Sequence, residues 1–203
     1  MPLALRSWLA SAELVEPNID GDVGLSLGAR AKAGDQLAMR LVYERYAPAV
    51  RRFIRDMLRD GQAADDALQD TFIRVTQGIG SLDEPEHLAG WIFGIARRVC
   101  FEHRRHRTRR QRNTELTAAD FEAADSSATP EALYFGSRAA EKLDRAVDRL
   151  EPDRRAILLL RCDHQLSYEE IATAMGFSLS KVKVELHRAR LALREVFREM
   201  GES

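Results

Sequence analysis

The stretch LSYEEIATAMGFSLSKVKVELHRARLAL, residues 166–193, decides how this sequence is interpreted. It predicts two short helices joined by a tight turn. Ser167, followed three residues later by Glu170, forms a capping-box pattern that starts a helix by pairing side chains with free backbone N–H groups. Gly176 suits the turn, and Ser178 can cap the second helix.

The second helix of this stretch is expected to have one apolar side and one basic side. The apolar side carries Val182, Leu186, Ala189 and Leu193. The basic side carries Lys181, Lys183, His187, Arg188 and Arg190. A helix-turn-helix with a cationic second helix is suited to the major groove of DNA. The pattern also fits an ordinary helical hairpin with a solvated basic face, because basic helices are common on protein surfaces.

The charges of the chain are balanced in number but uneven in position. Its 203 residues include 31 Lys and Arg and 32 Asp and Glu. Eight arginines lie within residues 97–112 beside one acid, Glu102. Residues 114–133 hold five acids and no Lys or Arg, and residues 181–198 hold six basic side chains and two acids. Two basic segments around an acidic one predict two DNA-facing modules joined by a spacer that avoids DNA.

Helical periodicity covers most of the remaining sequence. One helix is expected from Gly34–Asp35 to Leu58, with Pro48 kinking or breaking it and Gly61 ending it. Its inward stripe is expected to include Leu37, Leu41, Tyr43, Val50, Phe53 and Ile54. Further helices are expected over residues 63–77 and 86–107, around a loop at 78–85. Residues 112–130 show little periodicity, and a helical pattern resumes at 131 with a helix start at 152.

No strand-like alternation and no internal repeat occur, so the sequence predicts an all-α protein in two lobes. The first residues, MPLALRSWLASAEL, are expected to be a frayed N-terminal extension. Two cysteines give no disulfide framework, and no apolar run reaches the length of a membrane span. These features predict a reduced, cytosolic chain without direct membrane insertion.

Two clusters of potentially reactive side chains need an explanation. Cys100, His103 and His106 are spaced three residues apart, point in different directions on a helix and lie among arginines, so no metal or other cofactor is expected. Paired carboxylates at Asp66 and Asp70 suggest either acid–base chemistry or a hard-cation site. No glycine-rich phosphate loop or nearby partner histidine supports either interpretation, so no catalytic residues are expected.

Four motifs, in order, resemble a known family. DDALQDTFIRV, WIFGIARRV, an acidic linker and LSYEEIA with LHRAR are similar to bacterial RNA polymerase sigma factors of the extracytoplasmic-function (ECF) type, in the sigma-70 superfamily. The resemblance covers roughly residues 30–200. It implies two small helical domains, sigma region 2 and sigma region 4, joined by an acidic flexible linker. The expected boundaries are 1–30 for the extension, 31–111 for region 2, 112–133 for the linker and 134–203 for region 4.

The resemblance also implies a function. The chain would bind core RNA polymerase, recognise the −35 and −10 promoter elements and assist melting of the −10 element. It would be regulated by an anti-sigma factor and would not itself be an enzyme. The implied polymerase contacts are Asp66, Gln69, Asp70 and Arg74. The implied −10 contacts are Arg97, Arg98, Arg104 and Arg105. The implied −35 contacts are Lys181, Lys183, His187, Arg188 and Arg190.

The sequence departs from the family pattern at three positions. Arg98 stands where many relatives have an asparagine, and Val184 and Glu185 stand where a serine and an arginine are common. These differences predict unusual promoter preferences. They also leave open two other interpretations, an autonomous helix-turn-helix regulator with a helical effector domain and a module that docks on polymerase without directing initiation.

Overall fold

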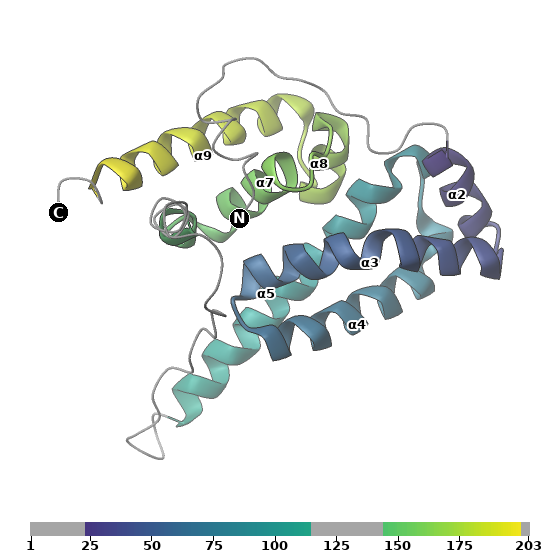
Figure 1. Cartoon of the computed structure of the whole chain (residues 1–203), viewed down its shortest axis with the longest axis horizontal. Coiled ribbons are helices and arrows are strands. Elements are labelled where there is room, and N and C mark those ends of the chain that lie inside the picture. The colour runs from purple at the N-terminus through teal and green to yellow at the C-terminus, as the bar shows by residue number, and fades with distance from the viewer. Residues whose placement is uncertain (1–22, 115–143, 200–203) are drawn as a thin grey trace, which may run out of the picture.

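The computed structural model describes residues 23–114 and 144–199, and the secondary structure in these ranges is helical (Figure 1). The first range contains α2 (Val23–Lys32), α3 (Gln36–Leu58), α4 (Gly61–Gly78) and α5 (Leu88–Thr114), with short 3-10 helices at Ile79–Ser81 and Pro85–His87. The second range contains α7 (Pro152–Cys162), α8 (Tyr168–Met175) and α9 (Leu179–Glu199). The all-α fold is confirmed. No helix in either range is long and apolar enough to cross a membrane.

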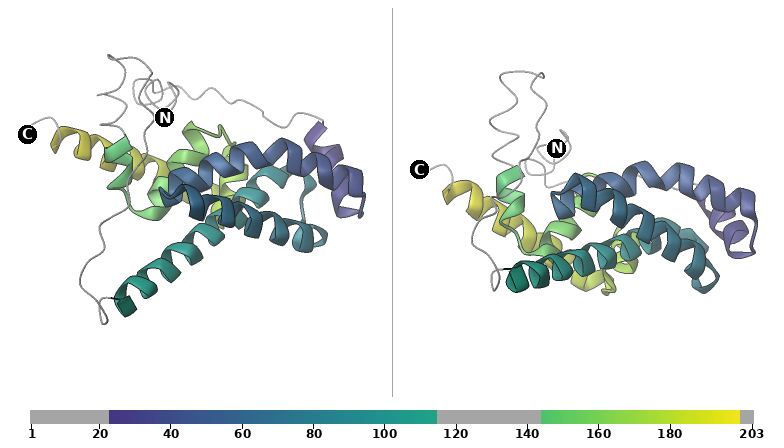
Figure 2. Two further views of the ribbon diagram at one scale, coloured as in Figure 1. Left: turned by 60° about the horizontal axis from the view of Figure 1, so that its bottom comes forward. Right: turned by 90° about the horizontal axis from the view of Figure 1, so that it is seen from below.

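The N-terminal lobe, residues 23–114, is built on α3, α4 and α5, which pack side by side (Figures 1 and 2). Its core includes Phe53, Ile54 and Met57 from α3 and Val75 from α4, all nearly inaccessible to solvent. Asp35 starts α3 because its side chain accepts hydrogen bonds from the backbone of Leu37 and Ala38. The C-terminal part of α5 projects past the other helices of the lobe (Figure 2).

Of the two expectations for Pro48, a kink or a break, the break is wrong, because α3 runs through this residue. Pro48 lies on an exposed face, where water can satisfy the Glu44 carbonyl that loses its backbone donor. Gly61 does not end α3 either. Arg59 takes the left-handed conformation at the C-cap, with φ of 56°, and Gly61 is the first residue of α4.

Two further boundaries differ from the sequence expectation. Part of the expected N-terminal extension is helix α2, which buries Leu27 and Ala31. At the other side of the lobe, α5 continues to Thr114, beyond the expected end at residue 107 and into the expected linker. The remaining residues of the extension and of the linker lie outside the described ranges.

The expected inward stripe of α3 is also wrong at its start. Leu37 is 59% exposed, Tyr43 is 49% exposed, and Leu41 is exposed as well. Tyr43 packs edge-on against Phe72 of α4, with ring centroids 4.8 Å apart, so it covers the edge of the core. The lobe therefore leaves an apolar surface open between α3 and α4.

The C-terminal lobe, residues 144–199, forms around the expected helix-turn-helix. Ser167 and Glu170 form the capping box, and Gly176 makes the turn with φ of 67°. The side chain of Ser178 accepts a hydrogen bond from the Lys181 backbone at 3.3 Å. The four expected inner residues of α9 are buried: Val182, Leu186, Ala189 and Leu193.

The two lobes pack against each other, chiefly through α5 and α8. Glycines allow this approach, because a β-carbon added at Gly90 would lie 2.8 Å from Cα of Glu170 and nearer still to its carbonyl oxygen. One turn later, a β-carbon at Gly94 would lie 3.1 Å from the Ala174 carbonyl oxygen. The sequence predicted two lobes but did not predict this direct contact between them, which we call the interlobe seam.

Candidate polymerase and nucleic-acid interfaces

The basic face of α9 is open to solvent. Lys181, Lys183, His187 and Arg188 are exposed, and Arg190 is half-buried. Lys181 also lies over the ring of Phe177, with its ammonium nitrogen 3.7 Å from the ring centroid. This contact fixes the first basic side chain beside the turn of the helix-turn-helix. All five expected −35 residues therefore belong to one helix whose opposite side is core.

Glu185 has a structural partner on the same face. It accepts a hydrogen bond from Arg188 at 2.9 Å, while most of the Arg188 side chain stays exposed. An ion pair between residues three apart on a helix restrains the guanidinium at little energetic cost. Glu185 is therefore placed to orient Arg188, and Val184 adds an exposed apolar side chain next to it.

The four expected polymerase residues on α4 differ in their surroundings. Asp66 and Gln69 are exposed. The Oδ2 atom of Asp70 lies 3.1 Å from Nε2 of His103 on α5. Arg74 donates two hydrogen bonds to the Glu102 carboxylate, at 2.9 and 2.5 Å. Asp70 and Arg74 therefore also tie α4 to α5.

An apolar groove of about 620 Å³ runs along α4 on the side that carries Gln69. Its walls include Tyr43, Leu68, Phe72 and Ile73, and Gln69 lies on its rim. Ile73 is 46% exposed and lies in this groove with the exposed Tyr43, so the two form part of one apolar patch. The sequence pattern did not predict this groove, because helical spacing placed Tyr43 in the core and gave no signal for Ile73.

The expected −10 arginines on α5 face different environments. Arg97 donates a hydrogen bond to Asp153 of α7 at 2.5 Å and stacks over Phe101. Arg98 is exposed and, with Trp91 and Gly176, lines a small cavity at the seam. Trp91 itself is half-buried rather than fully enclosed in the core.

Farther along α5, Arg104 is half-buried and Arg105 is exposed. Between these two ends of the helix, the Cys100 thiol is buried, which raises its pKa to about 12 and keeps it protonated. The structure brings Arg97 and Arg98 to the seam and leaves Arg104 and Arg105 on the projecting end of α5.

An aromatic cluster with a histidine fills part of the seam. His164, which follows α7, packs against Phe93 and Phe53, with centroid distances of 4.8 and 5.8 Å. Burial lowers the pKa of His164 to about 3, so the ring is neutral at physiological pH. Arg52 of α3 donates to the backbone carbonyl of Asp163 at 3.0 Å. The sequence pattern did not predict this cluster, because its contacts join positions far apart in the chain.

Asp163 is an unusual carboxyl group at the seam. It is 7% exposed, and neither side-chain oxygen has a hydrogen-bond partner in the described part of the chain. Burial, and then the charge of Asp56, raises its pKa to about 6. Near neutral pH the packed seam therefore contains a poorly compensated negative charge, which costs stability.

Asp163→Asn is expected to stabilise the protein by about 1–2 kcal/mol at about pH 7.5 and to have little effect near pH 4. The folded-state pKa lies above the ordinary value of 3.8, so stability is lost as pH rises through the interval between them. Asparagine keeps the shape and removes the charge. Urea denaturation at both pH values measures the difference, with the exposed Asp83→Asn as control. An equal effect of Asp163→Asn at the two pH values would contradict the assignment.

No cluster of three His, Cys, Asp or Glu side chains within residues 23–114 and 144–199 is arranged to hold a metal ion. The surfaces described above are instead broad and charged or apolar. Such surfaces are suited to macromolecular partners.

Both lobes match family models of known proteins. Residues 42–110 match the model of sigma-70 region 2, and residues 140–193 match the model of sigma-70 region 4. The chain is 31% identical over 172 residues to RNA polymerase sigma factor CarQ of Myxococcus xanthus, covering 84% of this chain and 95% of CarQ. It is 30% identical over 158 residues to ECF RNA polymerase sigma factor SigX of Bacillus subtilis, covering 77% and 81%.

A solved structure agrees in fold. The sigma factor RpoE, in complex with the anti-sigma factor NepR from Bartonella quintana, aligns with a TM-score of 0.60 and 23% identity over 78% of this chain and 96% of RpoE. The order of the two matched regions, the helical lobes that carry them and the relatives that span both regions lead to one conclusion. The chain belongs to the ECF group of sigma-70 RNA polymerase sigma factors.

Proposed function

We propose that this chain is a dissociable initiation subunit of a bacterial RNA polymerase. It binds core polymerase through the N-terminal lobe, recognises the −10 and −35 promoter elements and assists melting of the −10 element. The single observation that carries the proposal is the presence of both sigma regions, in order, on two helical lobes with exposed charged surfaces. RNA synthesis belongs to the polymerase, so the chain is not itself an enzyme, and it acts in the cytoplasm.

The polymerase contact is assigned to α4 and the groove beside it. Gln69 supplies a polar group to the groove walled by Tyr43 and Ile73. Asp66 and Asp70 lie on the neighbouring side of α4, next to His103 of α5. An apolar centre with a polar rim is typical of protein interfaces. Arg74 contributes by holding Glu102 and keeping α4 on α5 as well as by contact with the partner.

The −10 contact is assigned to Arg97, Arg98, Arg104 and Arg105 of α5, and the −35 contact to the five basic residues of α9. Guanidinium groups on an exposed helix pair well with phosphate oxygens, and a few of them can read base edges. Arg97 is paired with Asp153 of the other lobe, so contact with DNA requires that it exchange this carboxylate for a phosphate.

Control by an anti-sigma factor is part of the proposal. It is supported by the solved structure of RpoE, which was determined in complex with the anti-sigma factor NepR. The apolar groove along α4 gives such an inhibitor a surface that overlaps the assigned polymerase contact. Polymerase and inhibitor would then compete for the same side chains.

Run-off transcription with purified bacterial core polymerase and genomic fragments tests the function directly. New start sites that depend on the added chain support the proposal and reveal both promoter elements when aligned. Binding of duplex DNA by the chain alone, without new starts, would favour an autonomous helix-turn-helix regulator. Binding to core polymerase without starts on any fragment would favour a docking module.

Asp70→Arg is expected to weaken binding to core polymerase by about tenfold or more, because it places a cation where a partially exposed carboxylate now lies. The helical circular dichroism spectrum should not change. Titration of labelled core polymerase measures the affinity. Asp83→Arg, the same charge reversal at an exposed loop residue away from α4, is the control. Wild-type affinity of Asp70→Arg would remove Asp70 from the interface.

A further inference from the structure

The outward side of α9 presents two large apolar side chains among its basic residues. Val184 is 48% exposed and Leu191 is 49% exposed. Val184 lies two positions from each of the buried residues Val182 and Leu186, which places it on the opposite side of the helix from the core. A single exposed aliphatic side chain needs no explanation by itself. The position of Val184 along the helix and its neighbours are what give it a function.

Val184 lies in the second turn of α9, which begins at Leu179. In a helix-turn-helix, the residues near the N-terminus of the second helix are the ones that meet base edges in the major groove. Leu191 lies about two turns farther along. Leu179 is exposed as well, but it is turned about 140° away from Val184 around the helix. Of these apolar side chains, Val184 is therefore the one placed to reach a base.

Two cationic groups with restrained positions flank Val184. Lys181, three residues before it, holds its ammonium nitrogen 3.7 Å from the centroid of the Phe177 ring. Arg188, four residues after it, donates a hydrogen bond to Glu185 at 2.9 Å. Residues three and four positions apart are neighbours on a helix surface, so Lys181, Val184 and Arg188 form one row. Cations at both ends of this row attract the DNA backbone and bring the valine between them close to the bases.

The chemistry of the valine side chain limits which base it can select. Valine has no donor and no acceptor, so it cannot pair with the polar edge of a base. In the major groove, thymine alone among the four bases presents an apolar group, its C5 methyl. A β-branched side chain holds one dominant rotamer in a helix, so packing against that methyl costs little conformational entropy. Against another base, the valine would cover polar atoms without giving them a hydrogen bond, which is unfavourable.

We infer that Val184 contacts the C5 methyl group of a thymine in the −35 element and thereby selects that base. The inference rests on the proposed function, in which α9 lies in the major groove, and it adds a residue to the five assigned −35 contacts. Val184 and Arg188 are about 6 Å apart along the helix axis, and successive base pairs are about 3.4 Å apart. The selected thymine therefore lies within about two base pairs of the group that Arg188 contacts.

Deoxyuridine isolates this contact, because it lacks the methyl group of thymine and keeps the same hydrogen-bonding groups. The start sites found by run-off transcription define the −35 element, and each of its thymines, on either strand, is replaced in turn. Titration with the holoenzyme then measures the affinity for each fragment. With the wild-type chain we expect one replacement to weaken binding about fourfold, the value for one buried methyl group. The other replacements should have no measurable effect.

Three variants assign the methyl contact to Val184. Val184→Ala removes both γ-methyl groups, so the deoxyuridine penalty should disappear. Val184→Thr keeps one γ-methyl group and the branched shape, so it should keep most of the penalty. Leu191→Ala removes an exposed apolar side chain farther along the same side of α9 and should leave the penalty unchanged. Both positions are exposed, so the core of the lobe is preserved, and the comparison of base and side-chain changes forms a double-mutant cycle.

Two results would overturn the inference: equal affinity of the wild-type holoenzyme for the thymine fragment and for every deoxyuridine fragment, or a penalty that Val184→Ala leaves unchanged. The first result would place Val184 away from the bases. The second would mean that the methyl group acts through the shape of the DNA. Failure of the proposed function is a separate result, since run-off transcription would then show no start sites that depend on the chain, and both claims would fall. Start sites without a deoxyuridine penalty would remove only the contact by Val184.

Discussion

Gly90→Leu is expected to separate the two lobes while the helices of each lobe stay folded. A β-carbon at this position meets the backbone of Glu170, which cannot rotate away as a side chain would. Helix α8 must move as a whole, and the leucine side chain adds further volume at the closest point of the seam. Overpacking of this kind typically costs about 1–3 kcal/mol, and it falls on an interface that already buries polar atoms without partners.

Separation of the lobes would also break the packing of His164 on Phe93 and the hydrogen bond from Arg97 to Asp153. We therefore expect a larger radius of gyration in small-angle X-ray scattering, with unchanged helical content in circular dichroism. Gly61→Ala is the matched control, because a β-carbon there meets nothing within 4 Å. If Gly90→Leu keeps the dimensions and melting temperature of the control, the close packing of α5 on α8 does not describe the protein in solution.

Arg188→Ala is expected to weaken the binding free energy for the promoter by about 1–3 kcal/mol, which is a loss of affinity of roughly 5- to 150-fold. Arg188 lies at the centre of the exposed basic face of α9 and is held by Glu185. Removal of a base contact should relax specificity at one position of the −35 element, whereas removal of a phosphate contact should weaken all sequences alike. Occupancy by the holoenzyme on a panel of −35 variants distinguishes the two.

Glu185→Ala and Arg194→Ala complete the test of Arg188. Glu185→Ala frees the Arg188 side chain and removes a negative charge from the face, so we expect tighter but less specific binding. Arg194 is exposed farther along α9, outside the assigned contacts, and its replacement by alanine should have little effect. Promoter occupancy that Arg188→Ala leaves unchanged would remove this residue from the interface.

The fold and the family could be predicted from the sequence because their signals are local. Capping at Ser167, the turn at Gly176 and the apolar spacing of Val182 to Leu193 depend on residues a few positions apart. Those short-range rules predicted the helix-turn-helix and the residues of its buried face. They left open a kink or a break at Pro48, because exposure and the packing of the neighbouring turns decide whether a helix continues there.

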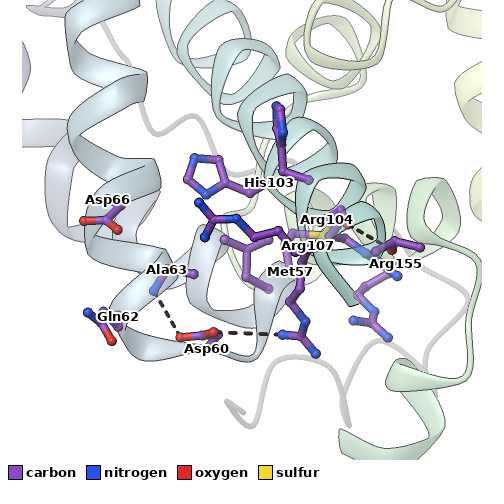
Figure 3. A pocket seen from close by; sticks show the side chains of 13 residues that line it. Met57, Asp60, Gln62, Ala63, Asp66, His103, Arg104, Arg107 and Arg155 are labelled. Carbon is purple, nitrogen blue, oxygen red and sulfur yellow. Dashed lines mark hydrogen bonds and ion pairs between the residues drawn. The ribbon is translucent and has the colours of Figure 1, made fainter. Parts of the chain in front are cut away.

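The sequence by itself determined the helices, the two basic surfaces and the order of the sigma motifs, because each follows from periodicity, capping or charge along one segment. Only the tertiary structure decided that Gly90 meets Glu170, that Arg97 pairs with Asp153 and that Arg104 and Arg155 share a cavity (Figure 3). These contacts join residues about 50 to 80 positions apart, and no local rule specifies them. They form because the two lobes pack against each other, and that packing sets which charged groups lie next to one another.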